Sequence, residues 1–557
     1  MQFLRLFLAL VLITPLPGAT RDPVRAKRAM VVSSEENATL AGVQVLREGG
    51  NAVDAAIAVG FALAVTHPWA GNLGGGGFML IRFVDGQAAF LDFRERAPGV
   101  ARRDMYLDSA GKPTDESLAG YRASGVPGTV RGFDLALRKY GSKPWSKLME
   151  PAIELAGKGF PVTWGLAESL RSGERLARFP ESHRIYQRNG QYYAMGDVLR
   201  QPDLEATLKR IAKDGPDEFY TGETARLIAA DMERSGGTIT LDDLKGYEAV
   251  EREPLRSRYK DYELLLAPPP SSGGIGIGQM LHMLEGSGYE KGGAGSASAM
   301  HYAAEVMRRY FADRARHFGD PDFTNVPGTG LLSKKYARER RSSIRSGRAT
   351  PSASLQAGEP ASYESAETTH YSVVDPQGNA VAVTYTLNGA YGSGVTAKGT
   401  GVLLNNEMDD FTVKPGEANM YGVLQGEKNA IEPRKRPLSS MTPTILSRGG
   451  KLFMVVGSPG GPTIISTVLE VILNVVDFKM NLQQAVDFPR FHHQWMPDEL
   501  RIERYGTSPD TIESLRRRGH EVRLVEAQGR VMAIQAGDDG WLLGAADSRS
   551  EGLALGF

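Results

Sequence analysis

Residues 368–388 read TTHYSVVDPQGNAVAVTYTLN. Two runs rich in valine, threonine and tyrosine, at 370–375 and 380–386, flank a turn of proline, glutamine, glycine and asparagine at 376–379. β-branched and aromatic residues on both sides of such a turn predict a β-hairpin. The preceding stretch, 347–366, is rich in Ser, Ala, Gly and Pro and predicts a solvated, mobile segment. The chain thus changes abruptly from predicted loop to predicted sheet near Thr368.

Strand pairs and helices alternate along the rest of the chain. Apolar spacing predicts helices within 37–66 (two, joined at 48–51), through much of 128–248, and at 299–317, 463–476 and 509–518. Strands are predicted at 77–83 and 88–93, 262–266, 443–447 and 452–456, 500–504, 521–525 and 531–536. Paired strands with helices between the pairs favour stacked sheets covered by helices.

The composition excludes several functional classes. The 557 residues include 65 basic and 65 acidic ones, and this zero balance argues against a nucleic-acid or anionic-membrane binder. The chain has no cysteine, which removes disulfides, cysteine nucleophiles, iron–sulfur clusters and cysteine zinc sites. His492 and His493 are adjacent, so on an extended chain they point opposite ways and suit packing better than joint metal ligation. No metal and no organic cofactor is implied.

The N-terminus is typical of an export signal. Arg5 precedes an apolar run at 6–13, and Thr14 to Thr20 then contains two prolines and a glycine. This pattern predicts a signal peptide over residues 1–19, cut near 18–20. The run is shorter than the roughly 20 residues that span a bilayer, so no stable membrane span is expected. The mature protein is predicted to be periplasmic or secreted.

Thr368 is a candidate nucleophile. The sequence has no G-x-x-x-x-G-K-[ST], H-E-x-x-H or G-x-S-x-G motif. A threonine whose own α-amine acts as the base needs no such motif, but that amine exists only after a cut before Thr368. An ordinary loop entering a strand explains the same residues, and the residues alone favour it.

A family resemblance favours the nucleophile over the ordinary loop. The stretch 368–388 resembles the start of the small subunit of γ-glutamyltranspeptidases, and the likeness extends over nearly the whole chain after the signal. The blocks that carry it are 49–56, 67–68, 71–78, 91–95, 125–128, 269–274, 320–321, 403–411, 436–441 and 457–461.

The resemblance implies an N-terminal-nucleophile hydrolase with an α+β fold, a four-layer αββα sandwich. One precursor would cut itself between Glu367 and Thr368 into a large subunit, 20–367, and a small catalytic subunit, 368–557. The two would remain a heterodimer forming one αββα unit.

The resemblance also implies roles for individual residues. Thr368 would be the nucleophile, oriented by Thr386, and the amides of Gly460 and Gly461 would form the oxyanion hole. The remaining residues would bind the substrate. Its α-carboxylate would be bound by Arg94, Ser439 and Ser440. Its α-ammonium would be bound by Asn388, Glu407 and Asp410. Tyr421, within 415–426, would belong to a lid over the pocket.

The implied function is that of a γ-glutamyltransferase and glutathione hydrolase. Small molecules are the expected partners: glutathione, other γ-glutamyl compounds, and amino acid or dipeptide acceptors. The nearest alternative is a related autoprocessed acylase of the cephalosporin or glutaryl type. Because a glutaryl group lacks an α-ammonium, the retained Asn388, Glu407 and Asp410 speak against it. A processed but inactive binding or scaffold protein is a third possibility, against which Thr368, Thr386 and the two glycines argue.

Overall fold

The computed structural model describes residues 20–360 and 370–557. The predicted signal peptide, the predicted cleavage position and Thr368 itself lie outside the described residues. In the described part of 347–366, exposed residues alternate with half-buried and buried ones such as Ala349, Ser352 and Leu355, and the regular structure is a short 3₁₀ turn, Ser352–Ser354.

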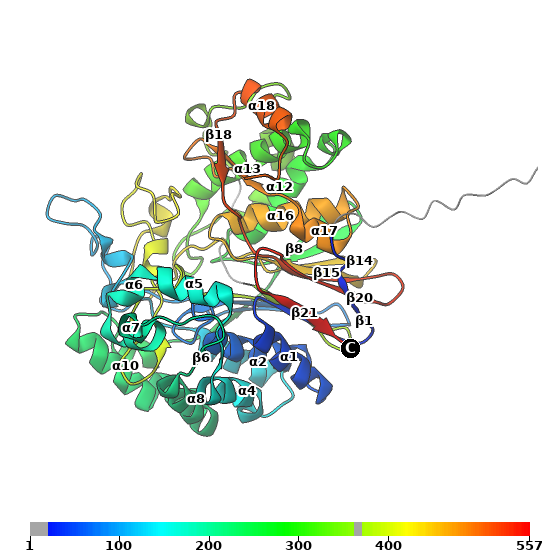
Figure 1. The fold of residues 1–557 in the computed structure, drawn as a ribbon. Helices are drawn as coiled ribbons and strands as arrows, with labels where there is room; N and C mark the ends of the chain where they lie inside the picture. The colour runs from blue at the N-terminus through cyan, green and yellow to red at the C-terminus, as the bar shows by residue number, and fades with distance from the viewer. Residues whose placement is uncertain (1–19, 361–369) are drawn as a thin grey trace, which may run out of the picture.

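Two antiparallel seven-stranded sheets are stacked in the described part of the chain (Figure 1). Sheet I has the strand order β1 (Val24–Ala26), β20 (Leu542–Ala546), β19 (Met532–Ala536), β15 (Lys451–Gly457), β14 (Thr444–Arg448), β9 (Tyr262–Leu266) and β8 (Leu255–Tyr259). Sheet II has the order β21 (Leu553–Gly556), β2 (Met30–Ser33), β10 (Tyr371–Val374), β11 (Ala380–Thr386), β3 (Gly76–Arg82), β4 (Ala88–Asp92) and β7 (Val250–Arg252).

The side chains of these strands alternate between two buried layers. Met30 and Val32 of β2 belong to the core between the sheets, whereas Val31 faces the helices. In β15, Val455 faces the other sheet, and its neighbour Met454 faces the helices. This alternation follows from the two-residue repeat of a strand, and strands buried on both faces need apolar residues at every position.

Helices cover both outer faces, which makes four layers (Figure 1). Sheet II is covered by α1 (Glu36–Arg47), α2 (Ala52–Thr66) and α3 (Thr129–Tyr140), and α4 (Trp145–Lys158) packs on α2. Sheet I is covered by α12 (Gly273–Leu284) and α16 (Thr463–Val476), and α13 (Ala297–His317) packs on α12. The predicted αββα sandwich is confirmed.

Smaller elements surround the sandwich. Further helices are α5 (Trp164–Ser172), α6 (Glu174–Ala177), α7 (Pro180–Gln187), α8 (Pro202–Asp214), α9 (Asp217–Thr221), α10 (Glu223–Arg234), α11 (Leu241–Lys245), α14 (Gly328–Leu331), α15 (Lys334–Ser342), α17 (Leu482–Asp487) and α18 (Pro509–Arg517). Short strands are β5 (Phe160–Pro161), β6 (Val198–Leu199), β12 (Thr396–Ala397), β13 (Val402–Leu403), β16 (Phe491–His492), β17 (Leu500–Glu503) and β18 (Val522–Val525). None of the helices within 20–360 and 370–557 has both the length and the apolar character needed to cross a bilayer.

Candidate active site

Thr386 ends the central strand β11 and lies where the two halves of the chain meet in sheet II. It pairs in register with Gly76 of β3 and is buried. Its backbone oxygen accepts a hydrogen bond from Asn72 Nδ2 at 2.8 Å, and its Oγ1 accepts one from Asn388 N at 2.8 Å. These contacts fix the Thr386 hydroxyl at the end of the strand. Thr368 lies outside the described residues, so its predicted contact with this hydroxyl stays a prediction.

Gly460 and Gly461 form the turn between β15 and α16. Their φ angles are +135° and +56°, values that favour glycine. Among the described residues, neither backbone N–H has a hydrogen-bond partner, although the Gly460 carbonyl accepts from Thr463. Two adjacent unpaired amides just before a helix N-terminus can stabilise a negatively charged oxygen.

Tyr421 joins this glycine turn to Asn388. A Cβ atom added to Gly461 would lie 3.0 Å from the Tyr421 ring, so the ring packs directly on this glycine. The Tyr421 hydroxyl donates to the Asn388 carbonyl at 3.0 Å, and Asn388 has a left-handed φ of +70°. The predicted lid residue therefore lies between two other predicted site residues.

Arg94 is the centre of a buried charged cluster. It lies two residues after the end of β4, and its Nη1 contacts Glu407 Oε1 at 2.5 Å while its Nη2 contacts Asp410 Oδ2 at 2.7 Å. Both acids lie on one 3₁₀ turn, Glu407–Asp410, which brings them to the same guanidinium. Glu95 Oε2 lies 3.7 Å from Arg94 Nη1. The structure thus brings together three predicted residues and adds Glu95, which the sequence analysis left without a role.

The cluster carries more acid than base. Burial raises the pKa of Glu95 to about 7 and that of Glu407 well above its usual range, although Arg94 opposes both shifts. Burial alone would lower the pKa of Arg94, but the charges of Glu407, Glu95 and Asp410 outweigh it and raise that pKa. The guanidinium therefore stays charged, and three buried carboxyl groups share this single cation.

Several buried polar atoms of this pocket have no hydrogen-bond partner among the described residues: both carboxylate oxygens of Glu95, Glu407 Oε2, Ser439 Oγ and Ser440 Oγ. The two serines follow Leu438, whose carbonyl accepts from Arg94 Nη2 at 3.3 Å. Native proteins pair nearly all buried polar groups, so a cluster of unpaired ones indicates a place for a polar ligand. A ligand bearing both an ammonium and a carboxylate would match these atoms.

The segment predicted as a lid, 415–426, is hydrogen-bonded to the acidic turn Glu407–Asp410. Asn419 Nδ2 donates to Asp410 Oδ1 at 3.3 Å, and Met420 N donates to Asp409 Oδ2 at 3.0 Å. Gln494 Nε2 donates to the carbonyls of Tyr421 and Gly422 at 3.2 and 3.0 Å. Asn419, Gln494 and Asn72 are contacts that the sequence analysis missed, because a lone amide side chain in a loop carries no distinguishing pattern.

His492 and His493 have separate surroundings. The His492 ring contacts Ser466 Oγ at 2.9 Å and Gln494 Oε1 at 3.0 Å, whereas His493 Nδ1 accepts from Trp495 N at 3.1 Å. Burial lowers the pKa of His492 to about 3, so its ring is neutral. In the described residues, no group of three or more histidine and acidic side chains is arranged to hold a metal ion.

The comparisons with known proteins agree with this geometry. A family model described as gamma-glutamyltranspeptidase matches residues 38–557. The chain belongs to the γ-glutamyltranspeptidase family. This is an enzyme family with an N-terminal nucleophile, and the predicted family resemblance is confirmed.

Relatives of this γ-glutamyltranspeptidase family member include hydrolases and acylases. The glutathione hydrolase proenzyme of Escherichia coli (strain K12) is 51% identical over 539 residues, covering 96% of this chain and 93% of that protein. The acylase ACY 1 proenzyme of Pseudomonas sp. (strain V22) is 39% identical, covering 96% and 94%.

Solved structures of the family share the fold. The cephalosporin acylase from Bacillus halodurans superimposes with a TM-score of 0.86 at 28% identity, covering 98% of each chain. The γ-glutamyltranspeptidase of Helicobacter pylori is 42% identical with a TM-score of 0.58, covering 58% of this chain and 94% of that one. Because hydrolases and acylases share this sandwich, the residues of the site must decide between their substrates.

Proposed function

We propose that this chain is the proenzyme of a glutathione hydrolase that cuts itself between Glu367 and Thr368. The products would be a large subunit, 20–367, and a small subunit, 368–557. Sheet II interleaves strands from both sides of that position, since β10 lies beside β2 and β11 lies beside β3. The cut fragments would therefore stay together as one sandwich.

Self-cleavage would use the Thr368 hydroxyl. Its Oγ attacks the carbonyl carbon of Glu367, the peptide C–N bond breaks, and an ester replaces the amide. Water then hydrolyses the ester and leaves Glu367 with a free carboxylate. Breaking the C–N bond leaves Thr368 with a free α-amine, which can act as a base near neutral pH, and hydrolysis of the ester restores its hydroxyl.

The mature enzyme would use the same atoms on γ-glutamyl amides. The Thr368 amine takes the hydroxyl proton while Oγ attacks the γ-carbonyl carbon of glutathione, and the proton then passes to the departing amine of cysteinylglycine. Water completes hydrolysis of the γ-glutamyl ester, and an amino acid or dipeptide amine completes transfer. The β10–β11 register pairs Tyr371 with Val383. Continued by three residues, that register would bring the nucleophile opposite Thr386.

The oxyanion of each step would be held by the N–H groups of Gly460 and Gly461. Both are unpaired among the described residues and precede α16. Removing one such donor from an acyl-transfer site typically costs about 3–4 kcal/mol of transition-state stabilisation. Tyr421 packs on Gly461 and would close the pocket against bulk water.

The observation that carries the donor assignment is the buried cluster in which Arg94 faces Glu407, Asp410 and Glu95. A γ-glutamyl group ends in an ammonium and a carboxylate. Its ammonium supplies a second cation beside Glu407 and Asp410, with Asn388 nearby. Its carboxylate would be held by Ser439, Ser440 and the planar fork of Arg94. In the structure that fork contacts both Glu407 and Asp410.

We further propose that the N-terminal signal directs the enzyme to the periplasm or outside the cell, where it needs no cofactor. The competing function is that of an acylase acting on glutaryl amides. A glutaryl group has no ammonium, so it would leave the acids unpaired, and buried unpaired charge is costly.

The test compares two chromogenic substrates after processing has been checked. Denaturing electrophoresis with N-terminal sequencing of the smaller fragment should give Thr368 as its first residue. Purified enzyme should then release nitroaniline faster from γ-glutamyl-p-nitroanilide than from glutaryl-p-nitroanilide. A preference for the glutaryl compound would refute the hydrolase assignment, and an uncut chain would refute the nucleophile.

A further inference from the structure

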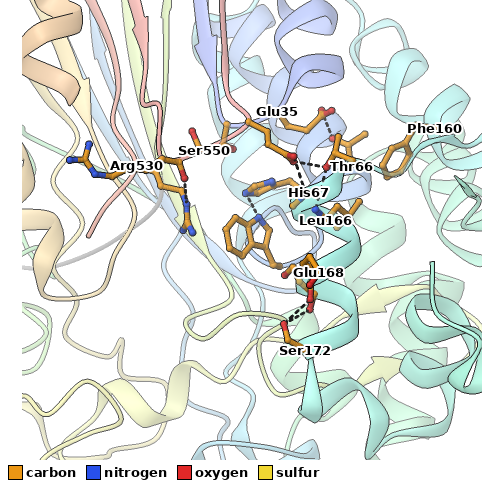
Figure 2. Close-up of a pocket in the computed structure, with 16 residues that line it drawn as sticks. Glu35, Thr66, His67, Phe160, Leu166, Glu168, Ser172, Arg530 and Ser550 are labelled. Atoms are coloured by element: carbon orange, nitrogen blue, oxygen red, sulfur yellow. Dashed lines mark hydrogen bonds between the residues drawn. The ribbon is translucent and has the colours of Figure 1, made fainter. Parts of the chain in front are cut away.

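A second cavity lies beside the oxyanion turn and is separate from the donor pocket. It encloses about 440 Å³ between α5, the residues that follow α2, and the loop around Arg530 (Figure 2). None of the proposed donor-binding residues lines it. Ligand pockets usually enclose about 300–1,000 Å³, so this cavity has room for a small organic molecule.

The loop at 529–530 connects the cavity to the proposed oxyanion hole. Arg530 N donates to Ser458 Oγ at 2.9 Å, and that same oxygen donates to the carbonyl of Pro459, the residue before Gly460. A Cβ atom added to Gly460 would lie 3.5 Å from Gly529 Cα. One side of the cavity is therefore in contact with the turn at which an acyl intermediate would be held.

The opposite wall connects the cavity to the loop that follows β11. Ser169 lines the cavity, and its Oγ lies 2.7 Å from the Tyr391 hydroxyl. Tyr391 N in turn donates to the carbonyl of Trp69, another lining residue, at 3.0 Å. The cavity thus lies between the oxyanion turn and the continuation of the strand that ends at Thr386.

The cavity presents one cation over an aromatic ring. The Arg530 guanidinium lies 4.4 Å from the centroid of the Trp69 ring, and Trp69 Nε1 donates to His67 Nε2. Burial lowers the pKa of His67 to about 3, so its Nε2 is free to accept this bond. In the described residues, Nη1 and Nη2 of Arg530 have no hydrogen-bond partner, and its Nε donates to the Arg549 carbonyl.

The other charged residues of the cavity are already paired. Glu35 accepts from Ala38 N and Thr66 Oγ1, and Glu551 accepts from Thr163 Oγ1 and Gly165 N. Arg549 is paired with Glu503, and Glu168 is paired with Arg171 at 3.1 Å. Trp69, Phe160 and Leu166 supply apolar surface. The cavity therefore matches a small, partly apolar molecule with one carboxylate.

We infer that this cavity binds the carboxylate end of the acceptor dipeptide, with Arg530 as its anion-binding residue and Trp69 as its apolar floor. The inference rests on the proposed function. The amine that leaves in the first step and the amine that attacks in the second occupy the same place, because the two steps run in opposite directions through the same ester. The cysteinylglycine released from glutathione and an accepting dipeptide therefore share this site.

The test measures how strongly the acceptor's carboxylate is recognised. With γ-glutamyl-p-nitroanilide as donor, transfer to glycylglycine and to glycylglycinamide is quantified by chromatography and divided by the hydrolysis rate. The unmodified enzyme should prefer glycylglycine at least tenfold, the usual effect of one charged hydrogen bond. Arg530→Met should reduce the preference to within about twofold, and Arg530→Lys should keep part of it.

Arg504→Met is the matched control, because Arg504 is an arginine paired with Glu526 and does not line the cavity. An Arg530→Met enzyme that keeps the full preference would overturn the inference. If Arg530→Met fails to process, Ser172→Phe at the cavity wall decides: a raised KM for glycylglycine supports the site and an unchanged KM overturns it. If the enzyme hydrolyses the donor but glycylglycine neither accepts nor inhibits, the inference fails while the proposed function stands. If no γ-glutamyl substrate is cleaved, both fail.

Discussion

Glu95→Gln should reduce a release of protons that accompanies binding of the γ-glutamyl group. Glu95 is fully buried, both of its carboxylate oxygens lack a partner among the described residues, and burial raises its pKa to about 7. A carboxyl with that pKa is roughly 90% protonated at pH 6 and roughly 10% protonated at pH 8. In the empty pocket it therefore keeps its proton through much of the neutral range.

An ammonium placed in this pocket favours the ionised carboxylate. At about 4 Å and an effective dielectric constant of about 20, the attraction is about 4 kcal/mol, which lowers the pKa by about three units. The complex then holds fewer protons than the free enzyme, so affinity rises with pH. Between pH 6 and pH 8 the expected gain in affinity is about tenfold.

Calorimetry tests this with two matched ligands. Titrating L-glutamate into the processed enzyme, in buffers of different ionisation heat, gives the number of protons released. Glutarate lacks only the amine, so the difference between the two ligands isolates the ammonium. At pH 7 the enzyme should release about half a proton more with glutamate.

The Glu95→Gln enzyme should show a clearly smaller difference, and its affinity for glutamate should vary less between pH 6 and pH 8; what remains would come from Glu407, whose pKa burial also raises. Equal proton release for glutamate and glutarate in the unmodified enzyme would refute the reasoning. So would a Glu95→Gln enzyme that keeps the full difference.

Three further substitutions separate processing from recognition. Thr368→Ala should leave an uncut precursor on denaturing gels, and a fragment beginning at residue 368 in that variant would place the cleavage chemistry elsewhere. Arg94→Lys keeps the charge but loses the planar fork that contacts Glu407 and Asp410. The KM for γ-glutamyl-p-nitroanilide should therefore rise clearly, while electrophoresis still shows processing. Unchanged kinetics would show that Arg94 does not bind the substrate. Asp410→Asn removes one charge with little change in shape, and since truncating a buried pair costs about 2–5 kcal/mol, γ-glutamyl activity should fall at least about tenfold. Glutaryl-p-nitroanilide activity should fall much less, and equal losses would give Asp410 a structural role.

Elements with a long local pattern could be predicted from the sequence. The helix at 463–476 has the predicted bounds, because its apolar residues repeat over several turns. The hairpin of β10 and β11 follows the valine-rich runs that flank the predicted turn. In these places, local preference and tertiary packing favour the same structure.

Elements that depend on distant partners were missed. β2 has four residues, too few to show a period, and its neighbours are β10 and β21, with Met30 opposite Gly556. β1 has three residues and pairs with β20. Such strands are stabilised by a sheet assembled from both ends of the chain, which no local window of sequence reveals.

The residues of the site likewise include some that the sequence analysis predicted and one, Glu95, that it did not. Arg94, Glu407, Asp410, Ser439 and Ser440 were expected near one substrate from the family resemblance. The structure places Arg94 against both acids and against the carbonyl before Ser439. Glu95 received no role, because an acid next to an arginine in a sequence usually indicates an exposed ion pair. Only its burial, through the packing of sheet II, makes it informative.

The excess of acid in this pocket gives a physical reason for discrimination between substrates. An acylase relative and a cephalosporin acylase share the chain length and the sandwich, so the scaffold alone does not decide the substrate. A ligand without an ammonium brings a carboxylate into a pocket where three buried carboxyl groups already share one guanidinium, and this added negative charge costs free energy. A γ-glutamyl ligand removes that cost on binding. Selectivity would then come as much from the penalty on the wrong ligand as from contacts with the right one. On this reasoning, neutralising the acids one by one should move the enzyme toward glutaryl substrates before it abolishes acyl transfer.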